Sequence, residues 1–101
     1  MNIYLAEILE SIEDNKFDES NFVPDEQNWS LVKLWAKNYI SKEVFPDNEL
    51  IDLLYFFYIH RHLDLYDYQH YSKVTEPIRE KYGISQADVI NMFSDFCKLL
   101  Y

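Results

Sequence analysis

Apolar side chains recur along most of the chain at intervals of three and four residues, which places them on one face of an α-helix. Between Ile3 and Asp14 the apolar positions are Leu5, Ile8, Leu9 and Ile12, with acids mostly opposite. A second stripe follows Pro24-Asp25-Glu26, where a proline and two acids favour a helix start. It predicts a helix that runs to about Ser41 and whose apolar positions are Trp29, Val32, Trp35, Ala36, Tyr39 and Ile40.

A third helix is predicted from Asp47, directly after Pro46, to about Leu63. From Leu50 to Ile59 every residue except Asp52 is apolar or aromatic. A helix that is apolar all round is central to a bundle or partly buried against another chain. We expect the first arrangement.

The next segment begins helically at Asp64 to Tyr71, but Pro77 lacks the N–H that a helix interior needs. We therefore expect a break or kink near Val74 to Glu76, followed by a short helix from about Thr75 to Tyr82.

Gly83 is the only glycine, and it stands where a left-handed residue would end that helix. Ser85-Gln86-Ala87-Asp88 is typical of a capping box, with Ile84 and Val89 spaced as a hydrophobic staple. The last helix should bury Val89, Phe93, Phe96, Cys97 and Leu100.

The chain has 101 residues, 49% of them hydrophobic, with one Gly and three Pro. This composition favours one all-α domain over residues 1–101, a bundle of four to five helices around the central apolar helix at about 47–63. Its core should include Trp35, Leu54, Phe57, Phe93 and Phe96.

The first residues lack the pattern of a signal peptide, and no apolar run is long enough to span a membrane. A single cysteine excludes an intramolecular disulfide, which suits a reducing compartment. We expect a cytoplasmic protein.

The formal net charge is −9, and the first thirty residues carry eight acids and one lysine. Such a charge repels nucleic acid and anionic membrane, and it steers the protein toward basic partners. The simpler alternative is that the acids only keep the protein soluble.

No spacing of residues predicts catalysis or a bound cofactor. His60 and His62 lie about 200° apart on a helix, so they are poorly placed as joint metal ligands, and with Arg61 they more simply satisfy the last helix carbonyls. Cys97 lies on the apolar stripe of the last helix, as a structural thiol would. Neither a nucleophile elbow nor a phosphate-binding glycine loop is present. We expect neither an enzyme nor a metalloprotein.

Residues 78–93 resemble a helix-turn-helix, with the turn at Gly83. The second helix of that unit, Gln86 to Cys97, offers acids and no Lys or Arg on its polar side. Contacts to phosphate and guanine need cations, so we expect a packing unit and no binding to nucleic acid.

A second similarity covers residues 46–68, where an acid-opened helix is followed by a tyrosine-rich acidic segment. This arrangement resembles the acidic helical immunity proteins of nuclease colicins and related bacterial toxins, in which the two parts bind the basic toxin. The resemblance implies a partner-binding surface made of Asp47, Glu49, Asp52, Asp64, Tyr66, Asp67 and Tyr68. Tyrosines beside acids would also suit a basic partner on physical grounds alone, although Tyr66 and Tyr68 could instead be half-buried core residues.

The sequence therefore predicts a small inhibitory or immunity-type protein, a monomer or weak homodimer, that neutralises a basic toxin, nuclease or other nucleic-acid-handling protein. Three alternatives stay open: an anti-CRISPR-like inhibitor, a regulatory helix-turn-helix protein, and a homo-oligomeric structural subunit that uses the third helix as its interface.

Overall fold

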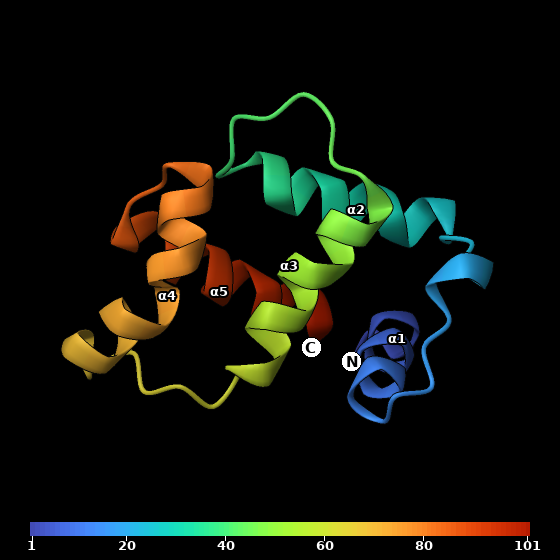
Figure 1. Cartoon of the computed structure of the whole chain (residues 1–101), viewed down its shortest axis with the longest axis horizontal. Coiled ribbons are helices and arrows are strands. Elements are labelled where there is room, and N and C mark those ends of the chain that lie inside the picture. Colours follow the sequence, from blue (N-terminus) through green and yellow to red (C-terminus); the bar gives the residue numbers. More distant parts are fainter.

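The computed structural model describes all of residues 1–101 and contains only helices and loops (Figure 1). The elements are α1 (Ile3–Glu13), the short 3-10 turn η1 (Glu19–Asn21), α2 (Glu26–Lys37), α3 (Asp47–Ile59), α4 (Tyr68–Tyr82) and α5 (Gln86–Leu100). The predicted all-helical bundle is therefore confirmed. None of its helices is long and apolar enough to cross a membrane.

Helix α5 contacts each of the other four helices, and α3 contacts α1, α2 and α5. The core residues predicted from the sequence are all buried: Trp35, Leu54, Phe57, Phe93 and Phe96. Phe57 on α3 packs edge-on against Trp35 of α2, with ring centroids 5.5 Å apart, and lies 5.9 Å from both Phe93 and Phe96 of α5. The apolar third helix is thus central, as expected, and shares that place with α5.

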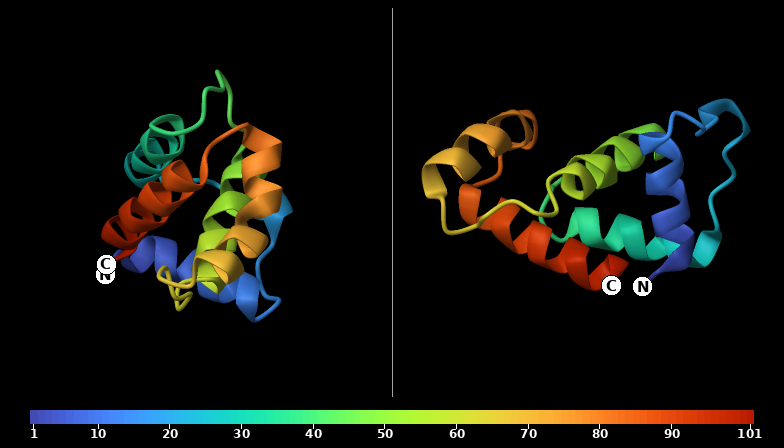
Figure 2. Two further views of the ribbon diagram at one scale, coloured as in Figure 1. Left: turned by 90° about the vertical axis from the view of Figure 1, so that its left-hand side faces the viewer. Right: turned by 90° about the horizontal axis from the view of Figure 1, so that it is seen from below.

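The two ends of the chain lie side by side (Figure 2). The backbone N–H of Asn2 donates to the carbonyl of Leu100 at 2.6 Å, which ties the start of α1 to the end of α5. The side chain of Asn2 also caps α1 by accepting the N–H of Leu5 at 3.1 Å.

Helix α2 ends at Lys37, earlier than the predicted end near Ser41. The backbone N–H groups of Tyr39 and Ile40 both donate to the Ala36 carbonyl. The bond from Tyr39 spans only three residues, so the chain forms a tight turn where the helix ends. At the other end of α2, Asp25 caps the helix.

Helix α3 ends at Ile59, four residues before the predicted end. The ring Nδ1 of His60 lies 2.8 Å from the Phe56 carbonyl, and Arg61 donates from Nη1 to the Tyr58 carbonyl at 2.7 Å. The side chains of His60 and Arg61 therefore satisfy carbonyls of the last helical turn, as predicted, whereas the His62 side chain forms no such bond.

Helix α4 begins at Tyr68 and continues unbroken through Pro77 to Tyr82, so of the predicted break or kink the break, with its separate helix from Thr75, is wrong. Figure 1 shows instead that the axis of α4 bends along its length. Thr75, where the separate helix was expected to begin, is a buried interior residue of α4 whose hydroxyl donates to the Tyr71 carbonyl at 2.9 Å.

The guanidinium of Arg79 bridges the turn that contains Pro77. Its Nη2 donates to the carbonyl of Ser72 at 2.7 Å, and its Nε donates to the Thr75 hydroxyl at 3.3 Å. These bonds tie the residues before the proline to those after it, and they offset part of the backbone hydrogen bonding that a proline removes.

The turn between α4 and α5 has the predicted geometry. Gly83 adopts φ +64°, and the N–H of Ile84 donates to the Arg79 carbonyl, which is the six-to-one bond of a Schellman motif. Ser85 and Asp88 then form the predicted capping box, with bonds of 3.0 and 3.3 Å.

Candidate functional site

The seven residues predicted to bind a partner fall into two groups at opposite ends of α3. Asp47 and Glu49 lie in its first turn and Asp52 in its second, whereas the remaining four, Asp64, Tyr66, Asp67 and Tyr68, follow its far end. The axis of α3 rises roughly 18 Å from Asp47 to Ile59. The structure therefore separates the predicted surface into two parts.

The acids of the first turn of α3 are occupied within the protein. Asp47 accepts a hydrogen bond at 2.9 Å from the indole Nε1 of the buried Trp29. Glu49 pairs with Lys42 at 2.5 Å and accepts the hydroxyl of Tyr82 at 2.9 Å. These two carboxylates thus connect α3 to α2, to the α2–α3 loop and to the end of α4.

The electrostatics of Glu49 follow from those contacts. The hydrogen bond from Lys42 holds the pKa of the Glu49 carboxyl below its ordinary value, against its partial burial and with help from Tyr82. Burial and the bond to Glu49 together raise the pKa of Tyr82. Asp52 differs from both acids of the first turn, because it is exposed and makes no hydrogen bond or ion pair within the chain.

The segment Asp64–Tyr68 forms the other part, which we call the tyrosine loop. Asp64 accepts the N–H of Tyr66 at 2.9 Å, and Asp67 caps α4 by accepting the N–H of His70 at 3.2 Å. Tyr66 is 89% exposed and Tyr68 63% exposed. The alternative that these tyrosines are half-buried core residues is therefore wrong.

A mostly apolar hollow of about 450 Å³ opens beside the tyrosine loop. Its lining residues are Leu63, Asp64, Leu65, Tyr66, Tyr68 and Ile90. Five of these are close in sequence, but Ile90 comes from α5. The sequence did not single out Leu63, Leu65 or Ile90, and no local signal could have found Ile90, because only the packing of α4 on α5 brings it to the loop.

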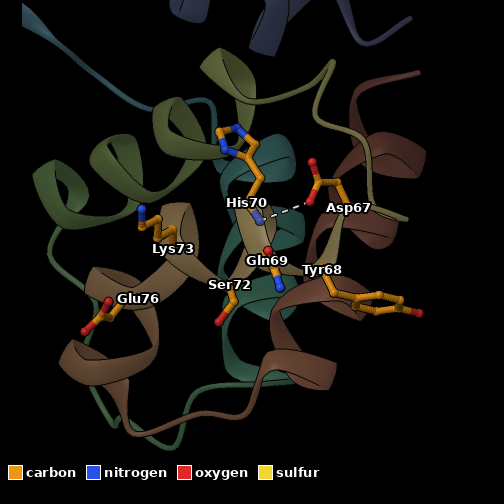
Figure 3. Close-up of a pocket in the computed structure, with 7 residues that line it drawn as sticks. All are labelled: Asp67, Tyr68, Gln69, His70, Ser72, Lys73 and Glu76. Atoms are coloured by element: carbon orange, nitrogen blue, oxygen red, sulfur yellow. Dashed lines mark hydrogen bonds between the residues drawn. The ribbon is translucent and has the colours of Figure 1, made fainter.

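A second, wider hollow of about 720 Å³ follows the exposed side of α4 (Figure 3). It is lined by Asp67, Tyr68, Gln69, His70, Ser72, Lys73 and Glu76. Figure 3 shows Tyr68 on the opposite side of the helix from Lys73 and Glu76. Since one helix and its cap supply all of these side chains, the hollow is a depression along a helix and not a cleft between elements.

Few acids are neutralised inside the protein. The chain holds eighteen acids and nine Lys and Arg residues, yet only Lys42–Glu49 and Lys98–Asp95 form ion pairs, the second at 3.8 Å. Asp64 and Asp67 are both exposed and belong to neither pair. A cation from another molecule therefore meets no competing intramolecular partner at the tyrosine loop.

The other side chains that could bind a metal, react or contact a ligand are either scattered over the structure or engaged in contacts within it. No three His, Cys, Asp or Glu side chains come together in a group that could hold a metal ion. Cys97 is partly buried, and burial raises the pKa of its thiol. On α5, Asp88 belongs to the capping box and Asp95 accepts the Tyr39 hydroxyl, so acids of the helix-turn-helix-like unit serve the fold.

No family model, curated protein or solved structure matches this chain.

Proposed function

We propose that the protein is a small acidic inhibitor of the immunity type, which binds a basic protein and covers its cationic surface. The partner would be a nuclease-type toxin or another protein that handles nucleic acid. The partner class is the one predicted from the sequence, but the binding surface is now centred on the tyrosine loop and not on the start of α3.

The exposure of Tyr66 and Tyr68 next to Asp64 and Asp67, two carboxylates that form no ion pair, carries the proposal. Large aromatic side chains exposed to this degree cost the isolated protein part of its hydrophobic stabilisation. They are also the residues that most often supply binding energy at protein interfaces. Placed beside Asp64 and Asp67, they form a surface suited to a partner that presents apolar and cationic groups together.

The net charge of −9 supports the same partner class. Long-range attraction between an acidic and a basic protein raises their association rate and weakens with salt, whereas buried aromatic contacts chiefly set the dissociation rate. Charged and aromatic residues of the tyrosine loop should therefore have separable kinetic effects.

The test begins with capture of the partner from the source cell and continues with binding kinetics of the purified pair. The double variant Asp64→Asn/Asp67→Asn removes two charges and keeps side-chain oxygens that can accept the same backbone N–H groups. It should slow association and flatten its salt dependence. Tyr66→Ala should speed dissociation by about 30-fold, which corresponds to about 2 kcal/mol.

A matched control is Glu19→Gln/Glu26→Gln, which removes the same charge from exposed positions at the starts of η1 and α2. Figure 1 shows that these segments lie at the far end of the molecule from the loop that precedes α4. The control should change the salt dependence less than the tyrosine-loop variant does. The proposal would be contradicted if the captured partner were acidic. It would also be contradicted if the partner were basic but neither Tyr66→Ala nor the double aspartate variant changed its association or dissociation rate.

A further inference from the structure

We infer that the hollow beside the tyrosine loop receives one apolar side chain of the partner, flanked in the partner's own sequence by Lys or Arg residues that pair with Asp64 and Asp67. This inference rests on the proposed function and makes it specific, because it names the chemistry of the segment that binds.

The lining of the hollow selects an apolar group. Leu63, Leu65 and Ile90 contribute aliphatic walls, and Tyr66 and Tyr68 contribute aromatic rings. The only charged side chain in the lining is Asp64. A volume of about 450 Å³ has room for one aliphatic or aromatic side chain and lies within the range of sites that bind small groups.

The charge around the hollow selects the residues that flank this apolar group. Asp64 and Asp67 each use Oδ1 to accept a backbone N–H, and the Oδ2 of each makes no hydrogen bond within the chain. Neither carboxylate is paired with a cation of the protein. Each therefore retains an oxygen for a donor from outside, and an ammonium or guanidinium is the donor that a carboxylate binds most strongly.

The backbone bonds also hold these carboxylates in place. The Asp64 carboxylate is held by the N–H of Tyr66, and the Asp67 carboxylate is held by the N–H of His70 at the start of α4. A group that is already ordered loses less conformational entropy when it binds, so the two acids are prepared to contact a cation. An acidic or neutral apolar segment could fill the hollow but would leave both carboxylates without partners.

Three heptapeptides test the inference on the full-length protein. The first has leucine between three lysines on each side, the second replaces that leucine by alanine, and the third keeps leucine and replaces all lysines by glutamine. Binding is followed by NMR titration of the protein labelled on its backbone amides and on the methyl groups of Leu and Ile. The lysine–leucine peptide should bind about tenfold more tightly than the alanine peptide, since the larger side chain buries more apolar surface.

The shifts should also be localised. The methyl resonances of Leu63, Leu65 and Ile90 should move with the lysine–leucine peptide and stay largely unchanged with the alanine peptide. Ile90→Ser should remove most of the difference between the two peptides. Leu34→Ser, at a position on α2 that is 59% exposed and outside the hollow, is the matched control and should preserve the difference. Far-ultraviolet circular dichroism of both variants checks that each is folded.

The outcomes separate this inference from the proposed function. Equal binding of both lysine peptides, with shifts spread over the acidic surface, would overturn the apolar anchor and leave a basic partner in place. Binding of the glutamine peptide as tight as that of the lysine–leucine peptide would overturn the basic partner and with it the proposed function. Absence of any shift at Leu63, Leu65 and Ile90 with every peptide would overturn the hollow as a binding site, while the kinetics of the captured partner would still test the function.

Discussion

Replacing Tyr71 by phenylalanine should leave the protein equally stable or make it more stable. Tyr71 on α4 is the largest of the fully buried side chains, only 1% exposed, and its hydroxyl has no hydrogen-bond partner. A buried polar group without a partner costs about 1–3 kcal/mol. The substitution removes only that oxygen and keeps the packing of the ring, but it leaves a small void that offsets part of the gain, so the free energy of unfolding should rise by up to about 1 kcal/mol.

Two other tyrosines provide matched controls. The hydroxyl of Tyr39 donates to Asp95, and that of Tyr82 donates to Glu49. Tyr39→Phe and Tyr82→Phe should therefore lower the free energy of unfolding by about 1–3 kcal/mol each, because both delete a bond to a charged group. Urea unfolding followed by tryptophan fluorescence measures all three variants. A loss for Tyr71→Phe as large as that for Tyr39→Phe would refute the argument, since it would mean that the Tyr71 hydroxyl is satisfied.

Alkaline pH gives an independent measure of the same burial. Burial raises the pKa of Tyr71 from 10.0 to about 12, so the folded protein resists an ionisation that the unfolded chain undergoes near pH 10. The contribution of this shift to stability is fully present below pH 10 and is lost as pH rises through about 12. Urea midpoints measured from pH 9 upward should fall less steeply for Tyr71→Phe than for the unmodified protein. Parallel curves would show that Tyr71 ionises as freely in the folded state as in the unfolded one.

Four further predictions address the core, the turn, acid stability and nucleic acid. Phe57→Ala should cost about 3–5 kcal/mol in urea unfolding, because Phe57 is 1% exposed amid rings from α2 and α5, and a loss below about 1 kcal/mol would contradict its central place. Gly83→Ala should cost about 1 kcal/mol from its φ of +64° alone, since an added Cβ would meet no atom within 4 Å; a much larger loss would show a steric clash. The stability advantage of the unmodified protein over Glu49→Gln should be present above pH 4.5 and shrink as pH falls, because the Glu49 pKa is lowered in the folded state; an advantage independent of pH would contradict this. Fluorescence polarisation with duplex DNA at physiological salt should detect no binding, and salt-sensitive micromolar binding would overturn the expectation from a charge of −9.

Local chemistry explains the parts of the fold that were predicted well. The helix stripes, the left-handed Gly83 and the Ser85–Asp88 capping box each depend on residues within one turn of one another. The burial of α3 was also predictable, because an apolar helix has no face that favours solvent. Short segments of the sequence are therefore sufficient to predict such features.

Helix α4 shows where local rules are insufficient, because they could not decide between a break and a kink. Pro77 does remove a backbone donor, but Tyr71 and Thr75 are buried and Arg79 hydrogen-bonds across the proline. Packing and a side-chain bridge together outweigh the local penalty, so that of the two predicted outcomes, a break or a kink, the helix shows only the bend. Neither compensation is visible in the spacing of residues around a proline.

The candidate site was predictable only in part for a similar reason. Tyr66 and Tyr68 could be recognised from their acidic surroundings, whereas the hollow beside them needs Ile90, which lies more than twenty residues further along the chain. The internal contacts of Asp47 and Glu49 were not predictable from the sequence either. Their spacing suggests an open acidic surface, yet Asp47 accepts a hydrogen bond from Trp29 and Glu49 accepts one from Tyr82, both of which are distant in the sequence.

This division of the acids decides how binding mutants must be interpreted. A substitution at Asp47 or Glu49 breaks a hydrogen bond that connects helices, so weaker partner binding by such a variant would not distinguish a contact from a loosened fold. The side chain of Asp52 makes no hydrogen bond or ion pair within the chain, and Asp64→Asn and Asp67→Asn keep the oxygens that accept backbone N–H groups. If variants at Asp52, Asp64 and Asp67 lose binding but not stability, the loss therefore reports the negative charge itself. Substitutions at these three aspartates thus distinguish an acidic surface that binds a partner from one that only contacts solvent.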